Sequence, residues 1–158
     1  MGHFRDITTG AAVRAEGSRG GAAAVCEDKQ LTISKPVVLI IDEHEDSRII
    51  IRTIAQHAGF EPVEAAHGRR GVELARERGP AVIVLDLDLL RGSALDVLAL
   101  LRREPALAGI PIIATSPNAV ERHAVIAVFD GFIRKPISIV SLLGELRRLA
   151  PLPPLLDA

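Results

Sequence analysis

The residues of this chain whose side chains are best suited to catalysis or binding each follow a short apolar run. They are the carboxylates Asp42, Glu43 and Asp86, the hydroxyl of Ser116 and the ammonium of Lys135. Three clustered carboxylates would repel one another unless a cation lay among them. All-oxygen ligands favour Mg²⁺, while a hydroxyl and an ammonium beside the metal suit phosphoryl oxygens. An aspartate at the centre could itself be the nucleophile and form an aspartyl phosphate.

Each of these residues also has a simpler structural role available. Acids flank helix N-termini, Ser116 could cap a helix, and Lys135 could be a solvated surface charge. What favours a joint site is that every one of them falls at the same end of its apolar run.

The elements that must position these residues are predicted by two alternating periodicities between Lys35 and Ala150. Apolar, β-branched runs predict strands at Val37–Ile41, Glu61–Ala65, Ala81–Leu85, Ile110–Thr115 and Gly131–Ile133. Helical spacing predicts helices at Ser47–Ala58, Arg69–Arg78, Ala94–Arg103, Ala119–Val128 and Ile139–Leu149. Continuously apolar strands are buried on both faces, which is typical of a parallel sheet. We therefore predict an α/β fold, a doubly wound five-stranded parallel sheet between five helices, with its ligand site at the carboxyl ends of the strands.

Composition narrows the class of protein. The 158 residues are 48% hydrophobic, and 19 basic against 20 acidic side chains give a net charge of −1. This balance argues against a dedicated nucleic-acid or membrane-surface binder. No apolar run approaches the ~20 residues that span a bilayer, and the single Cys26 forbids an intrachain disulfide. We expect a cytoplasmic protein.

Three regions are predicted along the chain. Residues 1–35 are rich in Gly, Ala and Arg and are predicted to be a flexible N-terminal extension, because they carry too little apolar surface to offset the entropy of ordering. Residues 36–150 form the domain. Residues 151–158 form a C-terminal tail whose prolines end the last helix.

From Val37 to Leu149 the chain resembles the receiver domain of two-component response regulators, in particular the single-domain chemotaxis regulators. Val38–Arg48 resembles the family's first strand and acid pair, and Val82–Asp86 its phosphoacceptor strand. Ile110–Ser116 is similar to its fourth strand, and Asp130–Pro136 to its fifth strand with the lysine and proline that follow. The resemblance implies a flavodoxin-like sheet in the order 2-1-3-4-5.

The resemblance also implies a role for each site residue. Asp86 would be the phosphorylated aspartate, and Mg²⁺ would be the cofactor. The implied metal ligands are Asp42, Glu43, Asp86 and the backbone carbonyl of Asp88. Ser116 would hydrogen-bond the phosphoryl group and Lys135 would ion-pair with it, and the bond from Lys135 to Pro136 is usually cis in the family.

Partners are implied in the same way. A histidine kinase or a phosphotransfer protein would supply the phosphoryl group, and the protein would not itself be an enzyme. Ser116 and the aromatic Phe132 would act as a switch, which passes the signal to the face made by the fourth helix, fifth strand and fifth helix. A downstream protein would dock there, with no direct contact to nucleic acid or membrane. A homodimer stays open.

Two departures from the family's pattern bear on this chemistry. Pro117 stands where the family usually has a small residue whose backbone N–H binds the phosphoryl group, and proline has no N–H to donate. Asp88 adds a fourth acid near the site if its side chain points inward.

Two alternatives remain. The segment Val82–Asp88 also resembles the Asp-x-Asp motif of haloacid-dehalogenase-type phosphatases, although that motif usually lies on the first strand. The chain could also be a degenerate receiver, a protein-binding scaffold that is not phosphorylated, and Pro117 is the main support for this hypothesis.

Overall fold

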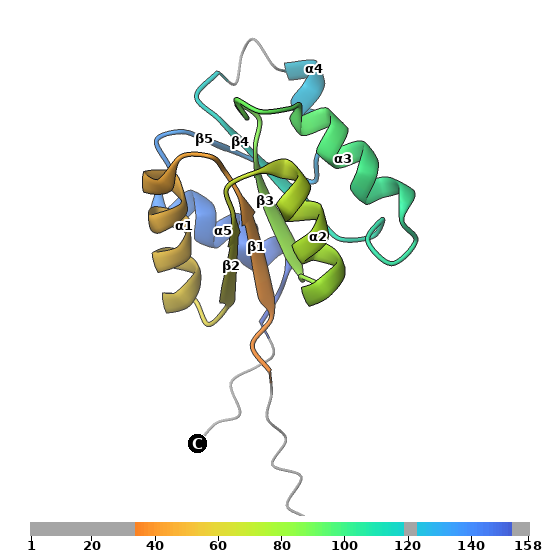
Figure 1. Cartoon of the computed structure of the whole chain (residues 1–158). Coiled ribbons are helices and arrows are strands. Elements are labelled where there is room, and N and C mark those ends of the chain that lie inside the picture. Colours follow the sequence, from red (N-terminus) through yellow and green to blue (C-terminus); the bar gives the residue numbers. More distant parts are fainter. Residues whose placement is uncertain (1–33, 119–122, 153–158) are drawn as a thin grey trace, which may run out of the picture. The chain divides into compact units, whose positions relative to one another are not determined.

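In the computed structural model, which describes residues 34–118 and 123–152, five parallel strands alternate with five helices. The strands are β1 Val37–Ile41, β2 Glu61–Ala65, β3 Val82–Asp86, β4 Ile112–Ser116 and β5 Gly131–Arg134. The helices are α1 Glu45–His57, α2 Gly68–Arg78, α3 Ala94–Arg103, α4 His123–Ile126 and α5 Ile139–Leu149. The strand order is β2-β1-β3-β4-β5 (Figure 1), so the predicted fold and sheet order are confirmed.

The predicted bounds differ from the observed ones by a few residues. β3 and β4 begin later than their apolar runs and include the polar residues at their ends, Asp86 and Ser116. The first four residues of the predicted fourth helix, 119–122, lie outside the described residues, and α4 is described only from His123.

The chain divides into two units, Met1–Ser34 and Lys35–Ala158, and the description below concerns the second. The predicted extension up to residue 33 and the tail from residue 153 lie outside the described residues, so the domain boundaries stay predictions. Among the described helices, none has the length and apolar character needed to cross a membrane.

Two hydrophobic cores hold the three layers together, because successive strand side chains point to opposite faces of the sheet. In β1, Val38 and Ile40 pack under α1 and α5, whereas Leu39 and Ile41 pack under α2 and α3. Figure 1 shows α1 and α5 on one side of the sheet and α2 and α3 on the other. All five residues of β3 are buried, as a central strand requires.

Helix α2 lies so close to β1 that only glycine fits at one position. A Cβ atom built on Gly71 would lie 2.7 Å from Cγ1 of Ile41, a side chain that is itself fully buried. The same helix begins at Gly68, where a Cβ would collide with Val97 of α3. The two glycines therefore set how closely α2 approaches the sheet and α3.

We predict that Gly71→Ala destabilises the protein by about 1–3 kcal/mol, because overpacking must displace Ile41. Chemical denaturation would measure the change. Gly144→Ala is the matched control: Gly144 lies in α5, exposed, with nothing within 4 Å of a Cβ placed there, and the substitution should stabilise by about 0.5–1 kcal/mol. Equal effects of both substitutions would contradict the close packing of α2 on β1.

Candidate functional site

The polar residues predicted for the site lie together at the carboxyl edge of the sheet. Asp86 ends β3, Ser116 ends β4, and Asp42 and Lys135 directly follow β1 and β5. Backbone hydrogen bonds continue the parallel ladder past the strand ends and fix these positions. They are Asp42 N–H to Ala65 O at 3.1 Å, Leu87 N–H to Thr115 O at 2.9 Å, and Lys135 N–H to Ser116 O at 3.0 Å.

Two buried carboxylates share one ammonium at the centre of this edge. Lys135 Nζ lies 3.0 Å from Asp42 Oδ2 and 3.2 Å from Asp86 Oδ2. The side chains of Asp42 and Asp86 are 1% and 0% exposed, so neither is screened by solvent. The bond between Lys135 and Pro136 is cis, as the resemblance implied.

The two oxygens of Asp86 have different surroundings. Oδ1 accepts a hydrogen bond of 3.0 Å from the backbone N–H of Asp88. Oδ2 is buried and is ion-paired with Lys135 Nζ at 3.2 Å, but among the described residues it accepts no hydrogen bond of adequate geometry. Burial raises the pKa of Asp86, and the neighbouring Asp42 raises it further, while the Asp88 N–H and Lys135 lower it. The net direction is upward because desolvation dominates.

His44 is a residue of the site that the sequence analysis did not single out. Its backbone N–H donates to Asp42 Oδ1 at 2.8 Å. Its ring Nδ1 lies 3.2 Å from the same oxygen and 3.5 Å from Asp86 Oδ2. The sequence signal that could have revealed it is the short spacing Asp42-x-His44, which lets both side chains turn toward one point.

Arg48 is a second residue that the sequence analysis passed over. Its NH1 group donates to the backbone carbonyl of Asp42 at 2.8 Å, and its Nε lies 3.5 Å from Glu64 Oε1 on β2. The guanidinium, 16% exposed, therefore ties the first turn of α1 to the end of β1. Arg48 thus holds the backbone of Asp42 through its carbonyl group and not through its carboxylate.

The remaining predicted ligands lie at the margin of the cluster. Glu43 Oε1 accepts a hydrogen bond of 2.8 Å from the backbone N–H of Arg91, in the loop after β3. The side chain of Asp88 points inward and accepts a hydrogen bond of 3.0 Å from Ser116 Oγ. The Ser116 hydroxyl is also the acceptor for the Asn118 N–H, at 3.1 Å. In this arrangement both Glu43 and Ser116 are engaged with neighbouring loops.

A cavity of about 440 Å³ lies beside the buried carboxylates and is lined by His44, Asp46, Ser47, Asp88, Pro117 and Lys135. Pro117 is exposed at its rim. Phe132, predicted as the switch residue, is half-buried on β5 opposite Ala114 and packs against the core under α2 and α3. The site is thus open to a small anion from solvent and closed beneath by the sheet.

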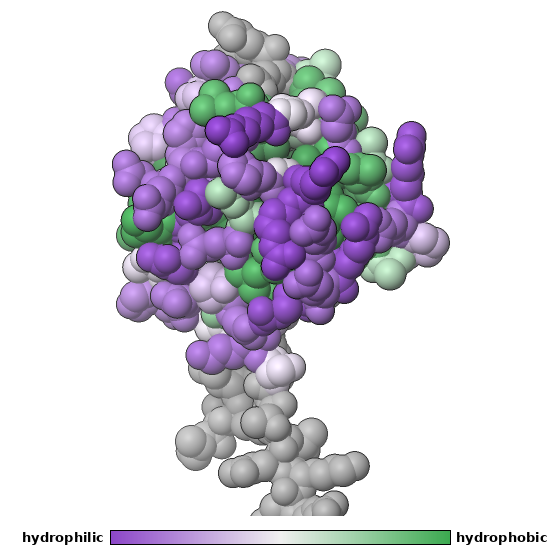
Figure 2. All heavy atoms as spheres, viewed as in Figure 1, coloured by the Kyte–Doolittle hydropathy of each residue, from purple (hydrophilic) through white to green (hydrophobic). Residues whose placement is uncertain are grey.

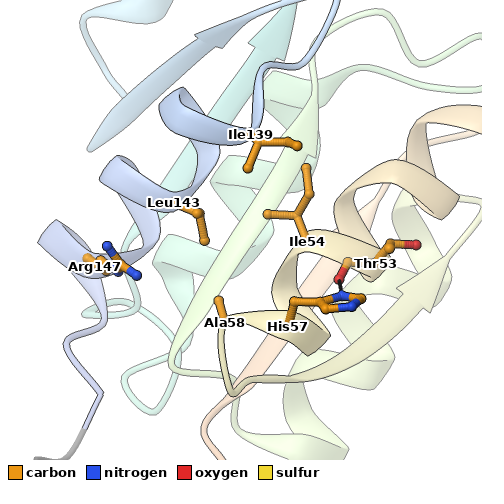
Figure 3. A pocket seen from close by; sticks show the side chains of 7 residues that line it. All are labelled: Thr53, Ile54, His57, Ala58, Ile139, Leu143 and Arg147. Atoms are coloured by element: carbon orange, nitrogen blue, oxygen red, sulfur yellow. Dashed lines mark hydrogen bonds between the residues drawn. The ribbon is translucent and has the colours of Figure 1, made fainter.

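Two other surfaces do not include the buried carboxylates Asp42 and Asp86. A hollow of about 330 Å³ between α1 and α5 has the apolar side chains of Ile54, Ile139 and Leu143 in its lining (Figure 3). The face seen in Figure 2 is mainly hydrophilic where α2 crosses it, and α2 exposes Arg69, Arg70, Arg76 and Arg78. Arg70 and Arg76 are paired there with glutamates.

Similar sequences are known. The sequence profile described as the response regulator receiver domain matches residues 38–147. The polar-differentiation response regulator DivK of Brucella anthropi is 30% identical over 105 residues, which cover 65% of this chain and 85% of that protein. DivK of Brucella ovis shows the same identity over the same length.

Similar structures are also known. The chemotaxis protein CheY4 of Vibrio cholerae covers 73% of this chain and 99% of its own, with a TM-score of 0.66 and 24% identity. The receiver domain of the sensor histidine kinase PA1611 from Pseudomonas aeruginosa, which carries a coordinated magnesium ion in its active-site cleft, covers 73% of this chain and 98% of its own, with a TM-score of 0.69 and 19% identity. At these identities the likeness concerns the fold alone.

We predict that Asp86→Asn raises the thermal stability of the metal-free protein at neutral pH. Because the pKa of Asp86 is raised by burial, the stability associated with its protonated form is present below its unfolded-state pKa and is lost as the pH rises through the folded-state pKa. Asparagine cannot ionise and avoids this loss. Melting curves in chelator-treated buffer between about pH 4 and about pH 7 should show the Tm of the variant rising relative to wild type. Parallel pH profiles would contradict a net penalty on the buried carboxylate.

Proposed function

The chain belongs to the response regulator receiver domain family, whose members act in two-component signalling, and from this premise we propose that it is a phosphoacceptor. Asp86 accepts a phosphoryl group from a phosphohistidine on a histidine kinase or a phosphotransfer protein, with Mg²⁺ as cofactor. The phosphorylated domain then passes the signal by docking to another protein. A cytoplasmic location stays a prediction.

The observation that carries this proposal is the state of Asp86. Its Oδ1 is fixed by the Asp88 N–H, whereas Oδ2 accepts no hydrogen bond from the described residues and lies 3.2 Å from Lys135 Nζ. A carboxylate oxygen that accepts no hydrogen bond, buried beside a cavity lined by His44, Asp88 and Lys135, is suited to attack an electrophile that enters there. A raised pKa also reflects a more basic carboxylate, although ionisation is needed for attack.

The residues present fit a hard divalent cation. Asp42 and Asp86 are buried with one shared ammonium, so their charge is incompletely neutralised. Their oxygens, with the Asp88 carbonyl and Glu43, form the all-oxygen set that Mg²⁺ prefers. Glu43 would have to exchange its hydrogen bond with the Arg91 N–H to join them. When bound, Mg²⁺ would neutralise the charge of the carboxylates and of the incoming phosphoryl oxygens.

In the transfer of the phosphoryl group, the protein contributes mainly the positioning of the reactants and the stabilisation of charge. A bond forms between an Asp86 carboxylate oxygen and phosphorus while the bond from phosphorus to the donor's imidazole nitrogen breaks, and its electron pair returns to that nitrogen. Lys135, already 3.2 Å from Oδ2, follows the negative charge from the carboxylate onto the phosphoryl oxygens. Its backbone hydrogen bond to Ser116 O keeps it within reach.

Ser116 and Pro117 set how well the product is held. The Ser116 hydroxyl must leave Asp88 Oδ2 to donate to a phosphoryl oxygen. Pro117, next to it, supplies no backbone N–H. The phosphoryl group therefore lacks the backbone N–H donor at position 117, and it must compete with Asp88 for the Ser116 hydroxyl. Both effects favour a weakly held phosphoryl group.

The output surface in this proposal is the face of α4, β5 and α5. Val128, which follows α4, and Val140 of α5 are exposed apolar residues, with 54% and 81% of their surface accessible, and we expect them to belong to this face. Phe132 connects the face to the site through β5, and it carries no hydroxyl, so packing alone sets its orientation. Formation of a homodimer through the same face stays open.

Of the alternatives, the phosphatase has lost its support, because the receiver profile covers residues 38–147 and such domains are signalling proteins rather than catalysts. The unphosphorylated scaffold keeps one specific observation in its favour, the proline at position 117. A phosphorylation assay separates the two functions.

We predict that acetyl phosphate or a cognate kinase, with Mg²⁺, adds one phosphate to the wild-type chain, and that Asp86→Asn abolishes the addition. The reason is that, among the described acids, only Asp86 combines burial with an oxygen free of hydrogen bonds. Intact-mass spectrometry would measure the addition. Asp96→Asn, which removes an exposed acid of α3, is the matched control and should be modified like wild type.

Omission of Mg²⁺ should reduce the modified fraction, since the phosphoryl dianion would then meet unneutralised carboxylates. A wild-type chain that stays unmodified with a functional kinase and Mg²⁺ would support the scaffold instead.

We predict that Pro117→Ala tightens binding of beryllofluoride, a mimic of the phosphoryl group. Restoring an N–H donor to a charged acceptor is worth ~1.5–3 kcal/mol at most, or roughly 10- to 100-fold, and a bridging water would reduce the gain. Titration followed by NMR would give the affinity, since the chain has no Trp or Tyr to report by fluorescence. An unchanged affinity would mean that another donor already serves the phosphoryl group.

A further inference from the structure

The imidazole of His44 has no part in the proposed phosphoryl transfer. His44 is the N-cap of α1, a position where Ser, Thr, Asp or Asn usually accepts a hydrogen bond from the helix. Its side chain makes no capping hydrogen bond. Nδ1 lies instead 3.2 Å from Asp42 Oδ1 and 3.5 Å from Asp86 Oδ2, although the side chain is 53% exposed. The ring is thus turned from the helix toward the two buried carboxylates.

These three residues form a ligand set that contains nitrogen. Asp42, His44 and Asp86 each offer one ligand atom, and the three atoms lie within 4.8 Å of one another. Asp86 is fully buried, and its Oδ2, which faces this group, is ion-paired with Lys135 at 3.2 Å but accepts no hydrogen bond from the described residues, so it is incompletely satisfied. The cation that would satisfy this oxygen could be held from both sides, by Asp42 and by His44.

Two of the three separations between these ligand atoms are compatible with a tetrahedral metal ion. Bonds of ~2.0–2.1 Å to zinc in a tetrahedral site place neighbouring ligand atoms about 3.3–3.4 Å apart. Octahedral Mg²⁺ with bonds of the same length places them about 2.8–3.0 Å apart. The two separations from His44 Nδ1, 3.2 and 3.5 Å, bracket the tetrahedral value. Imidazole is also a preferred ligand of zinc and its neighbours in the first transition row, and not of Mg²⁺.

The negative charge around Asp42 and Asp86 favours the binding of a divalent cation in addition to Lys135. The carboxylates of Asp42 and Asp86 have Lys135 as their shared cation, and Asp88 brings a further carboxylate close by through Ser116. A neutral imidazole adds a ligand without adding charge. Three protein ligands with one open position is the arrangement of catalytic zinc sites, in which a water or substrate takes the fourth position.

We propose that Asp42, His44 and Asp86 form a mixed nitrogen–oxygen site for a borderline divalent transition ion such as Zn²⁺, and that this ion withholds Asp86 Oδ2 from phosphorylation. The metal site stands on the geometry alone. Its inhibitory effect rests on the proposed function, because it requires Asp86 to be the phosphoacceptor. The site makes the domain responsive to the supply of transition metal as well as to its kinase.

The test is a calorimetric titration of the full chain with ZnCl₂ in a large excess of Mg²⁺, in a Cys26→Ser background so that the lone thiol contributes nothing. One Zn²⁺ should bind per chain. His44→Phe should weaken binding by at least about tenfold. His57→Phe, which removes an exposed histidine at the far end of α1, is the matched control and should bind as wild type does. Co²⁺ in place of Zn²⁺ should give the visible absorption of a tetrahedral site that is lost in His44→Phe.

Phosphorylation is then followed by intact mass, with and without Zn²⁺, within each variant. Zn²⁺ should lower the modified fraction of the wild-type chain and affect His44→Phe far less. Equal Zn²⁺ affinity in the wild type and His44→Phe overturns the metal site, whatever the phosphorylation result. Zn²⁺ binding through His44 in a chain that is never phosphorylated leaves the metal site standing, but overturns the proposed function and with it the inhibition.

Discussion

Two carboxylates buried beside one ammonium form the constraint on which the rest of this structure depends. Removing a charged group from water costs several kcal/mol even after the protein relaxes, and a single lysine cannot fully compensate two aspartates. Asp42 and Asp86 are nevertheless almost completely buried, with Lys135 between them. The pKa of Asp86 is raised for this reason, because the effect of burial on the carboxylate is larger than the opposing effect of Lys135. The excess negative charge at this edge of the sheet thus favours the binding of a cation and, together with the cation, of a phosphoryl anion.

The central strands hold these charged residues in place at the edge of the sheet. β1, β3 and β4 are buried on both faces by two hydrophobic cores, and their ladders continue as backbone hydrogen bonds at Asp42, Leu87 and Lys135. These bonds fix where the backbone leaves each strand, and therefore the points from which the charged side chains extend. Arg48 adds a further restraint by holding the carbonyl of Asp42.

Around this rigid centre, the groups with functional potential are held by exchangeable hydrogen bonds. Glu43 is bound to the Arg91 N–H, Ser116 to Asp88, and the His44 ring lies against Asp42 and Asp86. Each contact joins neighbouring loops and can be replaced by a contact to a metal ion or phosphoryl oxygen without a change of fold. Under the proposed function, a metal ion and a phosphoryl group would compete with these neighbours for the same few oxygen atoms.

The sequence by itself determined the sheet, because continuous apolar runs can only be buried between two layers of helices, and it identified Asp42, Asp86, Ser116 and Lys135, because each directly follows such a run. The bounds of β1, β2, α3 and α5 were predicted to the residue from apolar runs and helical spacing alone. The side-chain directions were decided only by tertiary structure. Asp88 meets Ser116 and Glu43 meets Arg91 across loops that are distant in sequence, and no local pattern encodes such pairs. The role of His44 was hidden for the same reason: its ring faces Asp86, 42 residues away in the chain, and only the parallel alignment of β1 and β3 brings the two together.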